Sequence, residues 1–148
     1  MFETVLVPPD GSRRAEAILP PVTFLAKGLG SRVTLLHILE STVETADAKI
    51  EAEAVRQMES VRSPAEGYLQ EMACSLRQEG ITVDAVVMAG KPYDVICNCA
   101  TDGGFGLVAM ATHGRGDIAR AVLGSVASRV LHACHRPLLL VRPPEAQR

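Results

Sequence analysis

The chain has 148 residues, of which 47% are hydrophobic and 22% charged, and its formal net charge is −2 at pH 7. These values predict one globular domain and exclude a disordered chain. The near-balanced charge and the content of 3% aromatic residues do not indicate binding to nucleic acid or to an anionic membrane surface. No run of about 18 apolar residues and no basic N-terminal leader occur, so we expect a soluble cytoplasmic protein.

Strand and helix patterns alternate in the first part of the chain. Thr4–Pro8 is a short apolar run closed by "PPDG", which is typical of a buried strand and a turn. Apolar residues at helical spacing predict a helix over Ser12–Leu29, with a kink or a break where Pro20 and Pro21 fall. "GLGS" ends this helix, and Arg32–Leu39 predicts a second buried strand.

The next segment is polar and leads into a second helix pattern. Glu40–Arg62 is rich in Ala and Glu, which predicts a loop followed by an exposed helix. This segment could cover a pocket or contact another protein, but its composition favours a plain solvated helix. In "SPAE", Ser63 as N-cap, Pro64 at the first helical position and Glu66 three residues after Ser63 predict a capping box. A new helix would then run from there to about Gln78.

The remaining elements complete an α/β pattern. They are a strand over Ile81–Gly90, a helix from Pro92 through Cys97 and Cys99 to "DGG", a strand over Gly106–Thr112, a helix over Ser125–His135 and a strand over Pro137–Pro143. The alternation predicts a doubly wound domain with a five-stranded, mostly parallel sheet and helices on both faces, over residues 1–143, with a short tail at 144–148. Ligands of such sheets bind beyond the carboxyl ends of strands, where the strand order reverses. The conspicuous loops "PPDGS" and "ATHGRG" follow the first and fourth strands.

Cysteine and histidine could in principle form a metal site. The four cysteines are Cys74, Cys97, Cys99 and Cys134. Cys97 and Cys99 form a C-x-C pair and "HACH" adds His132 and His135, but residues two apart on a helix point to different faces and no C-x₂-C pair accompanies them. Buried thiols and helix-end histidines are the favoured interpretation, and no disulfide framework is indicated. His37, inside an apolar strand, is interpreted as a satisfied core histidine.

The stretch "MATHGRGDIARAVLGS" is the strongest functional signal. Gly114 and Gly116 would let backbone N–H groups face an anion, and Ser125 opens a helix whose N-terminus favours the same anion. The Ser125 hydroxyl and Arg115 would add hydrogen bonds. The alternative is that the glycines only permit tight turning and Ser125 only caps its helix. A P-loop is absent, and "GRGDIA" lies too late in the chain for a dinucleotide fingerprint.

These motifs resemble those of the universal stress protein family. "ATHG", nine residues and then "GS" are similar to the G-x₂-G-x₉-G-[ST] loop of its ATP-binding type. "VLVPPDGS", "VTLLHIL", "MATHGRG" and "HRPLLLVRP" are similar to the family's first, second, fourth and closing strands. The resemblance implies a five-stranded doubly wound fold of the adenine nucleotide alpha hydrolase-like type, which agrees with the fold predicted from periodicity.

The resemblance also implies a function and a set of site residues. The function is a stress-response regulatory or signalling module that binds ATP or AMP, with Mg²⁺ held through the phosphates. The implied residues are Pro8, Pro9 and Asp10 beside ribose and adenine, Ile38 meeting adenine through its backbone, and Thr112, His113, Gly114, Arg115, Gly116, Gly124, Ser125 and Val126 around the phosphates. Ala111 replaces the first glycine of the motif. Alanine fits there with an extended backbone but not with a positive φ.

Two other functions are weighed against nucleotide binding. A slow ATPase would need a positioned base, for which Asp10, Asp117 and His113 are the local candidates. Each of these is equally explained as a turn or loop residue, so we expect no efficient catalysis. The other alternative is a dimerising module that has lost its ligand. Family members pair through the last strand, which implies a homodimer through Pro137–Pro143 unless this strand is central and already covered.

Overall fold

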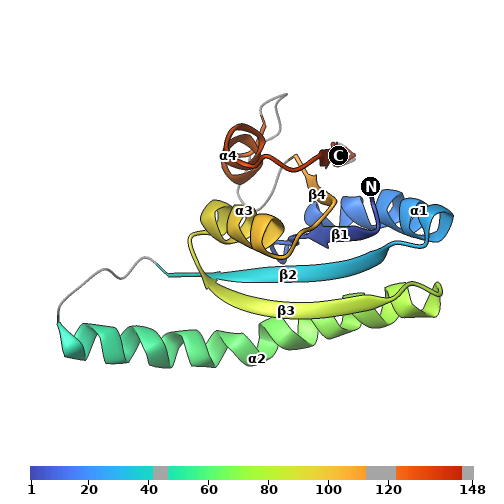
Figure 1. Ribbon diagram of the computed structural model, residues 1–148. Helices are drawn as coiled ribbons and strands as arrows, with labels where there is room; N and C mark the ends of the chain where they lie inside the picture. Colours follow the sequence, from blue (N-terminus) through green and yellow to red (C-terminus); the bar gives the residue numbers. More distant parts are fainter. Residues whose placement is uncertain (42–46, 113–122, 145–148) are drawn as a thin grey trace.

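Five parallel strands form the central sheet of the structure, a computed structural model that describes residues 1–41, 47–112 and 123–144 (Figure 1). The strands are β1 (Thr4–Val7), β2 (Arg32–Glu40), β3 (Val83–Gly90), β4 (Leu107–Ala111) and β5 (Leu138–Val141). Their order is β3-β2-β1-β4-β5 and every pairing is parallel. The chain therefore winds outward in both directions from the centre, as predicted, and the strand order reverses between β1 and β4.

Helices cover both faces of the sheet. They are the 3₁₀ turn η1 (Ala15–Ile18) and the helices α1 (Leu19–Leu29), α2 (Ala48–Gln78), α3 (Pro92–Asp102) and α4 (Ser125–Ala133). Successive residues of a strand point to opposite faces. Val5 and Val7 of β1 accordingly pack with α1 and α2, whereas Leu6 packs with α3 and α4. All three side chains are buried, so β1 is the shared centre of two hydrophobic cores.

The two prolines of the first helical segment mark where its geometry changes. Residues 15–18 form the 3₁₀ turn, and α1 begins at Leu19, so that Pro20 and Pro21 lie in its first turn. Proline costs no helical hydrogen bond there, because first-turn N–H groups have no intrahelical acceptor. Gly30 ends α1 with a φ of 66°, a left-handed conformation that glycine adopts without strain.

The capping box predicted at Ser63 is wrong. One helix, α2, runs from Ala48 to Gln78 and passes through Pro64, and its N-cap is Asp47, whose Oδ1 accepts a hydrogen bond of 2.9 Å from the backbone N of Lys49. Pro64 has no N–H to donate to the carbonyl four residues earlier, which weakens a helix locally. The apolar periodicity of α2 continues on both sides of Pro64, and burial of its residues from Ala65 onward stabilises the continuous helix.

The other predicted elements are confirmed, with ends displaced by up to three residues, since the helical segment predicted from Ser12 begins at Ala15. The strand predicted over Ile81–Gly90, for example, begins at Val83, and the helix predicted to end at His135 ends at Ala133. Residues 145–148 of the predicted tail lie outside the described part of the chain. Within the described ranges, no helix combines the length and the hydropathy needed to cross a membrane.

Replacing Pro64 by Ala should stabilise the domain, because Ala supplies the missing N–H donor within α2. Ala is favoured over Pro by about 3 kcal/mol in a helix interior. The greater flexibility of the unfolded chain without Pro64 offsets about 1 kcal/mol of this gain. We expect Pro64→Ala to raise the free energy of unfolding by about 1–2 kcal/mol in a urea titration.

Ser63→Ala is the matched control for this experiment. Loss of a true N-cap serine would cost about 1 kcal/mol, whereas Ala inside a continuous helix is neutral or slightly stabilising relative to Ser. A destabilised Ser63→Ala variant together with an unchanged Pro64→Ala variant would mean that the helix is interrupted at this point.

Candidate functional site

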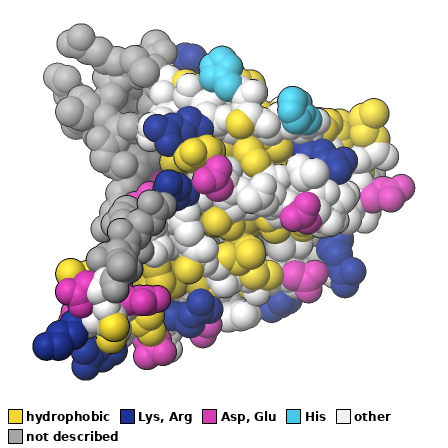
Figure 2. Space-filling model, turned by 60° about the vertical axis from the view of Figure 1, so that its left-hand side comes forward, with side chains coloured by type: hydrophobic (Ala, Val, Ile, Leu, Met, Phe, Trp, Pro, Cys, Tyr) yellow, Lys and Arg dark blue, Asp and Glu magenta, His cyan; other side chains and the backbone are white. Residues whose placement is uncertain are grey.

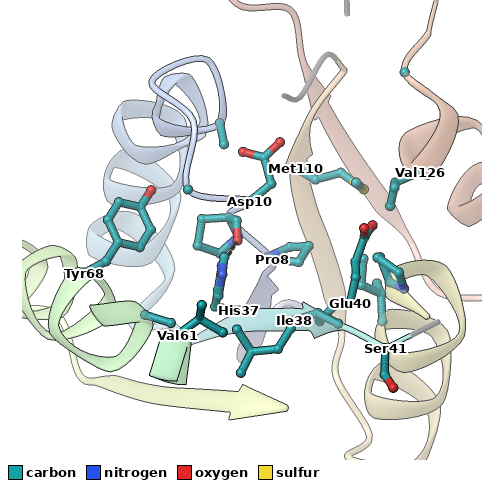
Figure 3. A pocket seen from close by; sticks show the side chains of 18 of the residues that line it. Pro8, Asp10, His37, Ile38, Glu40, Ser41, Val61, Tyr68, Met110 and Val126 are labelled. Atoms are coloured by element: carbon teal, nitrogen blue, oxygen red, sulfur yellow. Dashed lines mark hydrogen bonds between the residues drawn. The ribbon is translucent and has the colours of Figure 1, made fainter. Parts of the chain in front are cut away.

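A cavity of about 900 Å³ opens beyond the carboxyl ends of β1, β2 and β4. Its walls come from the loop after β1, the end of β2, the first two-thirds of α2, the end of β4 and the start of α4 (Figure 3). This position is the point of strand-order reversal, where open α/β sheets bind their ligands. The volume is at the upper end of the range of small-molecule sites.

The cavity brings together every predicted site residue that the structure describes. These are Pro8, Pro9, Asp10, Ile38, Ala111, Thr112, Gly124, Ser125 and Val126. They come from four separate segments of the sequence and line the same cavity. The other predicted site residues, His113, Gly114, Arg115 and Gly116, lie outside the described residues, as does Asp117.

Asp10 organises the loop after β1. Its Oδ1 accepts hydrogen bonds from the backbone N of Ser12 (2.9 Å) and from the Ser12 hydroxyl (2.6 Å). The Ser12 Oγ in turn accepts one from the backbone N of Ala15 (3.1 Å), the first residue of η1. Between them, Gly11 has a φ of 87°, which suits glycine. Asp10 therefore acts as a turn residue, and the turn fixes its carboxylate at the cavity.

His37 ties β2 to the same loop. Its Nδ1 lies 2.9 Å from the carbonyl oxygen of Pro9. A carbonyl oxygen only accepts, so Nδ1 carries the proton, and in neutral His37 the Nε2 atom is an acceptor. The sequence interpretation is right that the ring is hydrogen-bonded, but wrong about its place. His37 is half-buried in the cavity wall rather than in the core.

The N-terminus of α4 borders the cavity. Gly124 is the N-cap and provides no side-chain cap; its own N–H donates to the carbonyl of Thr112 at 2.6 Å. The interpretation that Ser125 merely caps the helix is therefore wrong. The first helical bond is from Ser128 to Gly124, so the N–H groups of the first three helical residues have no intrahelical acceptor. These residues, Ser125, Val126 and Ala127, all line the cavity.

Ala111 keeps the extended conformation that an alanine tolerates. It is the last residue of β4 and pairs with Val141 of β5. Among the residues that the structure describes, none except glycine has a positive φ. The methyl group that replaces the glycine of the motif therefore introduces no backbone strain at this position.

The sequence interpretation favoured a solvated helix over a contribution of α2 to the pocket, and the less favoured alternative is the one observed. The segment expected to be a solvated helix places Ala54, Met58 and Val61 in the cavity wall, followed by Ala65 and Tyr68. Spacings of three or four residues put these side chains on one face of the helix. That periodicity was readable in the sequence, but it does not show that this face adjoins the site.

Tyr68 combines a ring in the cavity wall with a buried hydroxyl. The ring packs edge-on against His37, with 6.2 Å between the centroids. The hydroxyl is buried and has no hydrogen-bond partner among the described residues. Burial, and to a lesser extent the negative charges of Glu16 and Asp10, raise the pKa of Tyr68 to about 12. The phenol therefore stays neutral well above the pH at which an exposed tyrosine ionises.

The cysteines are divided between core and surface. Cys134 is buried and Cys97 and Cys99 are half-buried, but Cys74 is exposed, which corrects the expectation of buried thiols throughout. Burial, together with the adjacent Cys134, raises the pKa of Cys97 to about 11. Burial and then Asp102 raise the pKa of Cys99. Among the described residues, no three His, Cys, Asp or Glu side chains are placed to hold a metal ion together.

The surface carries charges of both signs. On the face drawn in Figure 2, Lys and Arg side chains alternate with Asp and Glu, with hydrophobic side chains between them. Such a mixed surface gives no extended field of one sign among the described side chains visible there.

Comparison with known proteins gives consistent matches. Residues 1–142 match the universal stress protein family. Universal stress protein MJ0577 of Methanocaldococcus jannaschii is 23% identical over 155 residues, which span 96% of each chain. The solved structure of MJ0577 covers 99% of both chains with a TM-score of 0.88 at 25% identity.

Two further solved structures share the fold. One is a universal stress protein family protein from Arabidopsis thaliana with AMP bound, with a TM-score of 0.69 at 17% identity, covering 96% of this chain and 92% of the other. The second is a universal stress protein in complex with cAMP, with a TM-score of 0.63 at 19% identity. It covers 97% of this chain and 98% of the other. At these identities the likeness is one of fold alone.

The raised pKa of Tyr68 predicts a loss of stability at alkaline pH. The unfolded phenol ionises near pH 10 and the folded one near 12, so the unfolded state loses its proton first. The contribution of Tyr68 to the free energy of unfolding is therefore fully present below about pH 10. It is lost as the pH rises from about 10 to 12. Ultraviolet absorbance of tyrosinate should show one phenol titrating near pH 12, and Tyr68→Phe should remove that component. A titration in which Tyr68 ionises near pH 10 would contradict its burial.

Proposed function

Because the chain belongs to the universal stress protein family, we propose that it binds an adenine nucleotide in the cavity at the switch point. The base lies beside Ile38 and the phosphates lie at the N-terminus of α4. The observation that carries this proposal is the set of three first-turn residues, Ser125–Ala127, at an uncapped helix end that lines the cavity. Free backbone N–H groups and the positive end of the helix dipole together favour a phosphate group.

The choice of adenine draws on the proteins of the same fold. Solved structures of two such proteins hold AMP and cAMP. In this chain, Ile38 at the end of β2 lies in the cavity wall, where its backbone is in reach of a bound base. Pro8 and Pro9 supply rigid apolar surface on the neighbouring strand end. ATP and AMP share this base and differ only in the phosphates that α4 would contact.

Backbone groups, rather than cationic side chains, would hold the phosphate in the described part of the cavity. The charged lining residues there are Asp10 and Glu40, and none is Lys or Arg. A bound triphosphate would carry Mg²⁺, which prefers oxygen ligands. Asp10 and Glu40 are the carboxylates of the described lining that would face such an ion. Mg²⁺ would therefore be held through the phosphates rather than by a dedicated protein site.

We propose that the protein binds the nucleotide in a regulatory role in the cytoplasm. Asp10 is engaged in the turn with Ser12, and His37 is engaged with Pro9. Both side chains position the loop after β1, which forms part of the cavity wall. In this role the bound nucleotide changes the surface that the protein presents to a partner, as expected of a stress-response signalling module.

Ser125→Asp should weaken AMP binding at least tenfold without unfolding the protein. An aspartate at this position adds a negative charge beside the phosphate. In the first turn of a helix the same charge is favourable, by about 0.3–1 kcal/mol, so the domain should be as stable as before or more so. The measurement is calorimetric titration with AMP, beside urea unfolding of both proteins.

Ser125→Asn and adenosine are the controls for this prediction. Asn has nearly the shape of Asp without its charge, so Ser125→Asn should bind AMP much more tightly than Ser125→Asp. Adenosine has no phosphate and should bind both variants equally. Equal AMP affinity of the Asp and Asn variants would place the phosphate away from α4.

We propose in addition that the protein is a homodimer paired through β5. This strand is at the edge of the sheet and contacts only β4 among the described strands. Its four residues, Leu138–Val141, are apolar and half-buried, and an apolar edge strand left open invites association. The sequence analysis left open that this strand is central in the sheet. That alternative is wrong, because β5 is the last strand in the order.

Sedimentation velocity should detect this dimer. We expect the mass of two chains at micromolar concentration, and a shift toward one chain on dilution. A single-chain mass throughout the range from about 1 to 100 µM would contradict pairing through β5, because stable protein interfaces commonly have dissociation constants below this range.

A further inference from the structure

One apolar face runs the whole length of α2. Its members recur every three or four residues, and they are Ile50, Ala54, Met58, Val61, Ala65, Leu69, Met72 and Leu76. From Ala65 onward these side chains are buried in the core against the sheet. Before Ala65 they are not: Ile50 is 52% exposed and Val61 49% exposed. The same face is thus covered in one half and open in the other.

The open half extends beyond the sheet. At 1.5 Å per residue, the 31 residues of α2 span about 46 Å, whereas the eight residues of β3 span about 26 Å. Figure 1 shows the first half of α2 continuing past the carboxyl ends of β2 and β3. The sheet therefore cannot cover this part of the apolar face.

This open half is a wall of the cavity. The α2 residues of this half that line the cavity run from Ala54 to Val61, a length of about 10 Å along the helix, which is longer than a purine ring. In Figure 3, Val61 and Tyr68 lie on one side of the cavity, and Met110 and Val126 lie on the other. The apolar wall is thus at the end of the cavity opposite the N-terminus of α4.

We propose that this wall binds a hydrocarbon group carried on the base of the nucleotide. The preferred ligands are then adenine nucleotides with an apolar substituent on the ring, for example on N6. This inference rests on the proposed function, which places the phosphate at α4 and the base at Ile38. With that orientation the base faces α2, and a substituent on it extends over Met58 and Val61. Burial against these side chains removes apolar surface from water on both partners.

Calorimetric titration with AMP and N6-benzyl-AMP tests this proposal. Burial of about 60 Å² of the benzyl ring corresponds to roughly tenfold tighter binding than that of AMP. Val61→Ser puts a polar side chain on the wall and should reduce this advantage to about threefold or less. The readout is the ratio of the two affinities, so that any effect of Val61→Ser on the binding of AMP itself is divided out.

Val55→Ser is a matched control. Val55 is on the same helix and is 50% exposed, close to the 49% of Val61, but it does not line the cavity. The substitution has the same effect on helix propensity, so any change in α2 itself appears in both variants. The tenfold advantage of N6-benzyl-AMP should remain in Val55→Ser.

The outcomes separate this inference from the proposed function. If wild-type protein binds neither AMP nor N6-benzyl-AMP, the proposed function is wrong. If AMP binds and N6-benzyl-AMP binds equally or more weakly, the apolar wall does not accept a substituent and the inference is overturned. It is also overturned if Val61→Ser weakens both ligands equally, or if Val55→Ser removes the advantage as fully as Val61→Ser does.

Discussion

The separation of β1 from β4 beyond their paired residues is the constraint on which the site depends. The two strands pair at Val5–Leu107 and at Leu6–Val108, after which β1 stays with β2 and β4 continues beside β5. The chain leaves β1 toward η1 and α1 on one face, whereas β4 leads toward α4 on the other. Loops that diverge in this way leave a crevice between them. The cavity follows from the topology before any side chain is considered.

Within that crevice, hydrogen bonds hold the walls in place. Asp10 closes the turn after β1, and His37 joins β2 to the carbonyl of Pro9. The Gly124 N–H bonds the carbonyl of Thr112, which draws the start of α4 toward the end of β4. The Asp10 bonds fix the turn itself, and the other two connect a strand end to a neighbouring wall of the cavity. The site is therefore preorganised by groups that belong to the fold itself.

The sequence alone was sufficient for the strands, for the sheet and for many of the described residues that line the cavity. Buried strands are continuous apolar runs, and "PPDG" and Gly124-Ser125 are local signals of a turn and a helix start, so neighbouring residues suffice to find them. Pro64 shows the limit of this approach, because its local signal indicates a helix start, whereas α2 passes through it as one continuous helix that is buried only from Ala65 onward. The bond between His37 and Pro9 and the wall formed by Val61 were not predictable, because they depend on segments that meet only in the fold.

The uneven packing of α2 has a consequence for how the protein opens. Its second half is held by the core, but its first half has few buried side chains to lose. Regions of this kind unfold locally at a free energy well below that of the whole domain. We therefore expect the two halves of this continuous helix to belong to different cooperative units. A ligand lying against Val61 would slow amide exchange in the first half of α2 while the second half, already protected, changes little.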